Sequence, residues 1–239
     1  MKTVYLDIET APNLAVVWGI WQQNVAINQL LETGETMCMS YKWRDDDNVY
    51  FTRDLKDMWA VLNQADVVVT YNGDNFDLKT LNRDFLLAGI EPPDPYQSLD
   101  LLKVVRRRFR FVSNKLDFVC QELGIGRKVQ HTGMELWLAC MRNEPEAWEQ
   151  MEEYNVMDTI LLQELHDKLT PWIINGPHHG LHNRDGQCCP NCGSHNIIKK
   201  GFAYTNSSIF QRFKCKSCGT PIRSRLAEKE TRPDYVSCR

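Results

Sequence analysis

The stretch Thr3–Thr10, with the sequence TVYLDIET, decides the fold. Its apolar and polar residues alternate, which predicts a β-strand whose aliphatic positions 4, 6 and 8 face a core. Asp7 and Glu9 leave the opposite face of this strand, roughly 6–7 Å apart. Two carboxylates that close repel each other unless a cation lies between them. The strand therefore predicts either a metal site or a solvent-facing edge that carries two incidental acids.

Two further segments place acids near predicted elements. The apolar run 66–71 is typical of a central strand covered on both faces, and it leads into Asn72–Asp77, with the sequence NGDNFD. Asp158 interrupts the apolar stripe of a long predicted helix, one turn after Tyr154. An aspartate within such a stripe is rarely unpaired. The structural alternatives are an acid in the first turn of a helix for Asp77 and a buried hydrogen bond for Tyr154 and Asp158.

The remaining periodicities predict an α/β fold with a mixed sheet flanked by helices. Two strands, 36–43 and 49–52, would form an antiparallel meander with the first strand. Residues 98–105 fit a strand or a helix equally. Helices are predicted at 54–63 with Asp54 as the cap, at 76–88, at 115–123, at 132–141, and from a cap at Asn143 to Leu169.

Composition is that of a globular chain with an uneven charge distribution. The 239 residues are 43% hydrophobic and 25% charged, and no apolar run approaches the ~20 residues of a membrane span. The N-terminus has no signal-peptide layout, so we expect a cytoplasmic protein. Residues 183–239 hold 11 Lys and Arg against 4 Asp and Glu, a net of +7, whereas residues 1–182 hold 17 against 27, a net of −10. The basic tail either helps an acidic body to bind nucleic acid or only adds solubility.

A cysteine cluster near the C-terminus predicts a separate metal-bound module. Two Cys-x-x-Cys pairs, each followed by glycine, are separated by 22 residues. Four thiolates at this spacing suit a tetrahedral structural zinc site, and a module this small needs its metal to fold. The four predicted ligands are Cys189, Cys192, Cys215 and Cys218. We expect a zinc ribbon with a basic tail over residues 187–239, a linker over 173–186, and a main domain over 1–172.

The three acidic motifs together resemble one family in order and spacing. Asp7-Ile8-Glu9-Thr10, Asn72-x-x-x-Phe76-Asp77 and Tyr154-x-x-x-Asp158 are similar to the three motifs of the 3′–5′ exonucleases with four acidic residues, which have a ribonuclease H-like fold. The tyrosine form of the third motif resembles the proofreading exonuclease domain of B-family DNA polymerases. The resemblance covers about residues 1–170.

This resemblance implies catalysis by two Mg²⁺ or Mn²⁺ ions. Asp7 would bridge the ions, Glu9 and Asp158 would help hold the ion that generates the attacking hydroxide, and Asp77 would hold the second ion. Tyr154 would orient the attacking water. Carboxylate ligands favour Mg²⁺ or Mn²⁺ over zinc at this site.

Candidate substrate-binding residues fall in two places. The resemblance implies that Asn72 and Phe76 position the terminal nucleotide, although Phe76 also fits a core position. Residues 106–111 interleave cations with aromatic rings, a combination that suits a single strand through phosphate neutralisation and base stacking. The alternative is a solvated face with two core anchors. The residues concerned are Arg106, Arg107, Arg108, Phe109 and Arg110.

These observations lead to a metal-dependent 3′–5′ exonuclease that acts on nucleic acid. The resemblance favours single-stranded DNA over RNA as substrate, with 5′-mononucleotides as products. The alternatives are a structure-selective endonuclease or an RNA-directed nuclease on the same fold, and a non-catalytic nucleic-acid-binding module. The zinc ribbon would bind either nucleic acid or a protein partner.

Overall fold

The computed structural model describes residues 1–129, 132–228 and 235 and divides into two compact units. Lys2–Leu165 form the N-terminal unit, and Met1 with His166–Arg239 form the C-terminal unit. Cys238 and the rest of the predicted basic tail after residue 228, apart from Tyr235, lie outside the described residues. No helix in the described parts of the chain is long and apolar enough to span a membrane.

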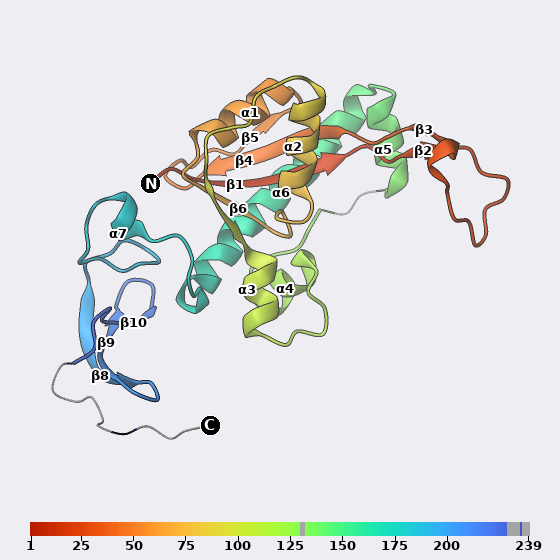
Figure 1. Cartoon of the computed structure of the whole chain (residues 1–239). Helices are drawn as coiled ribbons and strands as arrows, with labels where there is room; N and C mark the ends of the chain where they lie inside the picture. The colour runs from red at the N-terminus through yellow and green to blue at the C-terminus, as the bar shows by residue number, and fades with distance from the viewer. Residues whose placement is uncertain (130–131, 229–234, 236–239) are drawn as a thin grey trace. The chain divides into compact units, whose positions relative to one another are not determined.

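A mixed five-stranded sheet with the order β5-β4-β1-β6-β7 organises the N-terminal unit (Figure 1). The strand β1 pairs antiparallel with β4 and parallel with β6, while β4 pairs antiparallel with β5 and β6 pairs parallel with β7. The strands are β1 (Thr3–Thr10), β4 (Thr36–Trp43), β5 (Tyr50–Thr52), β6 (Val67–Thr70) and β7 (Gln97–Asp100). This arrangement confirms the predicted ribonuclease H-like fold class and the antiparallel meander.

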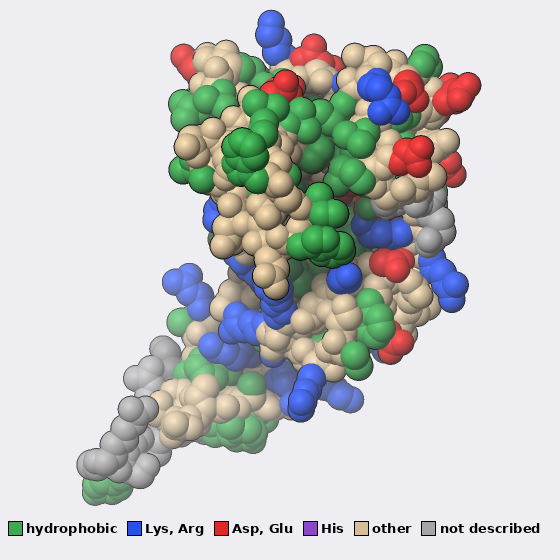
Figure 2. Space-filling view, turned by 90° about the vertical axis from the view of Figure 1, so that its right-hand side faces the viewer, with side chains coloured by type: hydrophobic (Ala, Val, Ile, Leu, Met, Phe, Trp, Pro, Cys, Tyr) green, Lys and Arg blue, Asp and Glu red, His purple; other side chains and the backbone are tan. Residues whose placement is uncertain are grey.

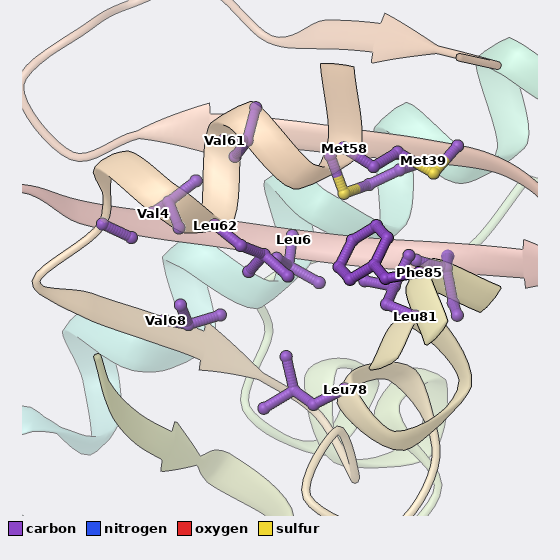
Figure 3. Packing of buried hydrophobic residues seen from close by; sticks show 12 residues of the cluster. Val4, Leu6, Met39, Met58, Val61, Leu62, Val68, Leu78, Leu81 and Phe85 are labelled. Carbon is purple, nitrogen blue, oxygen red and sulfur yellow. The ribbon is translucent and has the colours of Figure 1, made fainter. Parts of the chain in front are cut away.

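Helices cover both faces of this sheet (Figure 1). One core cluster joins the aliphatic residues of β1 to α1 and α2, and Figure 3 shows Val4 and Leu6 packed with Leu62 of α1 and Phe85 of α2. A second cluster on the opposite face joins Cys38 of β4 to α5 and α6. The helices are α1 (Leu55–Gln64), α2 (Asp77–Leu87), α3 (Leu101–Arg108), α4 (Leu116–Glu122), α5 (Met134–Met141) and α6 (Pro145–Leu169).

Local sequence explains most of these boundaries. Asp54 caps α1 by accepting a hydrogen bond from the Lys56 N–H at 2.7 Å, as predicted. The ambiguous segment 98–105 contains both a strand and a helix, because β7 ends at Asp100 and Asp100 caps α3. The predicted cap at Asn143 is wrong. Asn143 has a φ of 58° and donates its N–H to the Cys140 carbonyl, so it closes α5, and α6 begins at Pro145.

Residues 11–35 form an arm that the sequence did not predict. The arm contains two short antiparallel strands, β2 (Leu14–Ala15) and β3 (Leu30–Glu32), and the 3₁₀ turn η1 (Ile27–Gln29). It leaves the sheet at the end of β1 and returns at the start of β4 (Figure 1). Strands of two or three residues give too few alternations for a periodicity to reveal them.

The C-terminal unit holds a three-stranded antiparallel sheet with the order β10-β9-β8. Its elements are η2 (Thr170–Trp172), α7 (His179–His182), β8 (Ile197–Tyr204), β9 (Ile209–Cys215) and β10 (Pro221–Arg223). The Asn191 side chain donates to the carbonyls of Thr170 at 2.8 Å and Ile173 at 3.0 Å, which ties the first cysteine pair to the segment after α6.

The stretch predicted as a linker, residues 173–186, is part of this packed unit. The His179 N–H donates to the Pro190 carbonyl at 2.9 Å. A Cβ atom at Gly180 would lie 2.2 Å from the Asp185 carbonyl oxygen, so the chain folds tightly back on itself there. The small and polar residues of this segment form a compact turn next to a cysteine pair. Such a turn has the same composition as a flexible linker, so composition alone does not distinguish the two.

Candidate functional site

Three acids from two distant segments converge on the face of the sheet covered by α6. Carboxylate oxygens of Asp7, Glu9 and Asp158 all lie within 4.8 Å of one another. The helix is fixed to the sheet beside them, because the Ser40 hydroxyl donates to the Asn155 carbonyl at 2.7 Å. The structure thus brings together two of the three predicted acidic motifs with metal-ligand geometry.

Asp77 joins this group from the opposite side of β1. Its Oδ1 accepts a hydrogen bond of 3.3 Å from the Ile8 N–H, between the two acids of the strand. The turn before it is tightly constrained, since a Cβ atom at Gly73 would lie 2.2 Å from the Thr70 hydroxyl oxygen. This turn lets α2 start within reach of β1. Asp77 is buried in the first turn of α2 and also lies beside the acidic group, so its place fits the helix-dipole alternative and leaves its site role a prediction.

Two residues without a predicted role contact the acids. The Lys128 ammonium pairs with the buried Asp158 carboxylate and donates to the Tyr154 hydroxyl at 3.3 Å. The Asn155 amide donates to Asp7 Oδ2 at 2.8 Å and to the Asp7 carbonyl at 3.3 Å. Asn155 lies within the third motif, one residue after Tyr154, so the motif itself could have indicated that Asn155 lies near the acids. Lys128 lies in a loop after α4, where sequence periodicity gives no such signal.

Burial raises the pKa of every acid in the group, and repulsion from the other acids of the group adds to this for Asp7 and Glu9. Burial, followed by the charges of Asp77, Asp158 and Glu9, raises the pKa of Asp7 well above its ordinary value. Burial and the Asp158 charge raise the pKa of Glu9 to about 8. Burial raises the pKa of Asp77 to about 6. Burial also raises the pKa of Asp158, against the opposing effect of Lys128. One lysine therefore does not neutralise this group of carboxylates, and a further cation would lower these pKa values.

The donor set fits divalent cations that prefer oxygen. Every side chain in the group is a carboxylate, the ligand that Mg²⁺ and Mn²⁺ favour. The Asp158 Oδ1 atom is buried and has no hydrogen-bond partner among the residues that the structure describes. A buried oxygen of this kind is costly unless it coordinates something. Burial, followed by the Asp158 charge, raises the pKa of Tyr154 to about 12, so its phenol remains protonated at neutral pH.

The structure places the predicted substrate-binding residues in two groups. Phe76 is 43% exposed, so it is not a core residue, and it immediately precedes Asp77. The Asn72 N–H donates to Asp100 Oδ1 at 2.8 Å, which holds the turn near the end of β7. The arginines form the exposed last turn of α3 and its continuation, and the rings of Phe109 and Phe111 lie 5.7 Å apart. These residues are Arg106, Arg107, Arg108 and Arg110.

A second group with metal-ligand geometry lies in the C-terminal unit. Sulfur atoms of the four predicted cysteines all lie within 4.8 Å of one another, and two pairs, Cys189 with Cys218 and Cys192 with Cys215, are separated by 3.7 Å. A tetrahedron with Zn–S bonds of about 2.3 Å has edges of roughly 3.8 Å. Cys188 instead directs its sulfur toward the Asp185 carbonyl at 3.4 Å. Among the residues that the structure describes, these two groups are the candidates for metal binding.

A comparison with known families bears on the fold and on the acidic group, but not on the four cysteines. The model of the RNase H superfamily matches residues 4–170, about two thirds of the chain. The chain belongs to the RNase H superfamily. The match covers the sheet, α6 and all four acids. Superfamily membership and this fold support a nuclease that uses divalent metal ions.

A comparison with solved structures gives the same fold. The family B DNA polymerase from the hyperthermophilic archaeon Pyrobaculum calidifontis is similar with a TM-score of 0.53 and 16% sequence identity over 71% of this chain. The aligned part is 24% of the polymerase, so this RNase H superfamily member spans about a quarter of that protein. A comparison with curated proteins gives no match.

Proposed function

We propose that this RNase H superfamily member is a two-metal-ion 3′–5′ exonuclease. The observation that carries the proposal is the convergence of Asp7, Glu9 and Asp158 oxygens within 4.8 Å, with Asp77 hydrogen-bonded beside them. The likeness to a protein described as a DNA polymerase supports DNA as substrate. The products would be 5′-mononucleotides and a strand shortened at its 3′ end.

Bound Mg²⁺ or Mn²⁺ would supply an activated hydroxide and stabilise the charge on the leaving 3′ oxygen. Asp7 would help hold both ions, and the Asn155 amide holds its carboxylate in place. Glu9 and Asp158 would help hold one ion, and Asp77 would help hold the other. The raised pKa values of these acids support their role as ligands, because the group is stable as four carboxylates only beside added positive charge.

Tyr154 and Lys128 would act on the substrate side of the acids. The protonated Tyr154 phenol can donate a hydrogen bond to the attacking water or to the scissile phosphate, but it cannot act as a base at neutral pH. The Lys128 ammonium lies next to this phenol and to Asp158. We propose that Lys128 balances the charge of Asp158 before metal ions bind and contacts the phosphate afterwards.

The C-terminal unit is proposed to hold one structural zinc ion and to bind nucleic acid. Residues 197–225 contain seven Lys and Arg and no Asp or Glu. Arg212 pairs across the sheet with Arg223, and Lys214 lies on the same face two residues further on. The Arg223 guanidinium also covers the Phe210 ring at 4.0 Å. These cations on one sheet face can neutralise phosphates, and this supports nucleic acid as the ligand of the C-terminal unit.

An assay of cleavage polarity tests the proposed activity. Single strands of DNA and RNA labelled at the 5′ end, each with either a free or a chemically blocked 3′ end, are incubated with the protein and Mg²⁺. The proposal predicts a ladder that shortens from free 3′ ends, with faster hydrolysis of DNA and no hydrolysis of the blocked strand. Internal cuts in the blocked strand would instead identify an endonuclease. Binding without any hydrolysis would identify a non-catalytic module.

A further inference from the structure

The arm formed by residues 11–35 is attached at the edge of the sheet that carries the acids. The strands β1, β6 and β7 run parallel, so their C-terminal ends meet at one edge. Ligands of open α/β sheets bind beyond this edge. Asp7 and Glu9 lie among the last four residues of β1, just before the arm begins. Asn72–Asp77 follow β6 at the same edge. The arm, which joins the end of β1 to the start of β4 (Figure 1), is therefore tethered close in sequence to Asp7 and Glu9.

The arm has a defined backbone structure. Its two sides are joined by hydrogen bonds of 2.9 Å from the Ala11 N–H to the Glu35 carbonyl and from the Val16 N–H to the Gln29 carbonyl. The Gln29 amide donates in return to the Val16 carbonyl at 3.0 Å. A Cβ atom at Gly34 would lie 1.9 Å from the Ala11 carbonyl oxygen, so the two sides approach closely at the base.

This ordered arm exposes large apolar side chains. Trp18 is 96% exposed and Trp21 is 80% exposed, and the aliphatic residues Ile20 and Ile27 are similarly open. Figure 2 looks at the side of the molecule from which the arm projects and shows hydrophobic side chains gathered over its upper part. Monomeric proteins rarely expose apolar groups so densely unless they bind something there.

Charge and attachment indicate the ligand. Residues 11–31 contain no charged side chain, whereas residues 1–182 carry a net charge of −10. An acidic body repels phosphates, so contacts that do not depend on charge can supply affinity for nucleic acid. Base stacking on exposed aromatic rings is such a contact, and it tolerates any sequence. The position of the arm beside the acids also places it where a strand entering the acidic group would pass.

We propose that Trp18 and Trp21 are a stacking platform for the bases of a single-stranded nucleic acid whose 3′ end lies at the acidic group. This inference rests on the proposed function and adds a substrate-binding site to it. Trp18 lies nine positions after Glu9, a reach of up to about 30 Å at ~3.3 Å per residue. At ~3.4 Å per stacked nucleotide, the platform would engage bases up to about nine nucleotides from the 3′ end.

The test compares two double variants of the full-length protein. Trp18→Ala/Trp21→Ala removes the indoles, and Ile20→Ala/Ile27→Ala is a matched control that removes equally exposed aliphatic groups. Kd is measured by anisotropy with a labelled oligothymidylate of about 20 nucleotides, a length within the range that single-strand binding surfaces cover. KM and kcat are measured on the same strand with Mg²⁺.

The expected result is a rise in Kd and KM of at least about fivefold per indole for the tryptophan variant, with kcat largely retained. The control keeps the parent Kd, and Trp18→Phe/Trp21→Phe recovers most of the loss. The loss should be similar at about 50 and 200 mM salt, because stacking releases few counterions. An unchanged Kd for the tryptophan variant, or an equal loss in the control, would overturn the proposal. A parent protein that sediments as a dimer and a tryptophan variant that sediments as a monomer would also overturn it, because the arm would then bind a second copy of the chain.

The outcomes also separate this proposal from the proposed function. A parent protein that binds the strand through its indoles but hydrolyses nothing would refute the exonuclease and leave the platform intact. A parent protein that hydrolyses the strand with the same KM as the tryptophan variant would refute the platform and leave the exonuclease intact.

Discussion

Asp7→Asn is expected to stabilise the metal-free protein while abolishing hydrolysis. One Asp7 carboxylate oxygen lies within 4.8 Å of an oxygen of Glu9 and of an oxygen of Asp158. Two unit charges at that distance repel by about 3.5 kcal/mol at an effective dielectric constant of about 20. Lys128 already offsets the charge of Asp158, so the uncompensated part is chiefly the repulsion between Asp7 and Glu9. Protonation of Glu9, whose pKa is about 8, removes most of this repulsion at neutral pH, so we expect a net gain of roughly 1–3 kcal/mol only at a pH above about 8.

The asparagine keeps the size of Asp7 and can still accept a hydrogen bond from the Asn155 amide. For a unit of this length, roughly 1–3 kcal/mol corresponds to a rise in Tm of about 3–10 °C. Scanning calorimetry of both proteins without divalent ions, at a pH above about 8, measures this rise. Added Mg²⁺ should then raise the Tm of the parent protein and leave that of the variant nearly unchanged. A lower Tm for the variant without metal, or more than a few per cent of parent activity with Mg²⁺, would refute the account of Asp7 as a repelled metal ligand.

Four further predictions follow from the same contacts. Without divalent ions, the stability of the protein should fall as pH rises from about 4 to 8. The pKa of Glu9 is raised to about 8 and that of Asp77 to about 6, so the folded state holds more protons than the unfolded chain in this window. Thermal melts across that range should show the fall in stability, and added Mg²⁺ should remove it. Tyr154→Phe should lower kcat by roughly 10²-fold or less, because it removes one orienting hydrogen bond; a variant as inactive as Asp7→Asn would give Tyr154 a larger role. Lys128→Met should destabilise the metal-free protein by up to roughly 3–5 kcal/mol in denaturant titrations, since the buried Asp158 loses its charged partner, and an unchanged midpoint would argue against that pair. Cys215→Ser should lose the single bound zinc ion, as elemental analysis would show, yet still hydrolyse a short oligonucleotide, because the acids lie in the other unit.

The sheet and the acids were accessible to sequence reasoning because their signals are local. The alternation in β1 and the apolar stripe through Tyr154 and Asp158 each fix which side chains face inward, and all of the predicted stripe is buried. Side-chain direction then determines which acids can meet. The family model and the structure confirm the fold class that these patterns predicted.

Sequence periodicity did not predict the contacts made by loops. Lys128 reaches Asp158 from a segment with no periodicity, and its position depends on how the loop after α4 is anchored, including the hydrogen bond of 3.0 Å from the Lys128 N–H to Asp117. The arm was missed for a related reason, because its strands are held by backbone contacts and close approach at Gly34. Asn143 was misassigned because asparagine suits both a helix N-cap and the left-handed residue that ends a helix.

The metal dependence of hydrolysis tests the central claim most directly. The parent protein, loaded with zinc and freed of other divalent ions, is incubated with a single strand of DNA labelled at its 3′ end, and mononucleotide release is followed as Mg²⁺ or Mn²⁺ is added. The account predicts no release before addition, release that rises with either ion, and none at any concentration for Asp7→Asn. Undiminished release in the absence of added Mg²⁺ and Mn²⁺, or equal release by Asp7→Asn, would contradict a catalytic metal site built from Asp7, Glu9, Asp77 and Asp158.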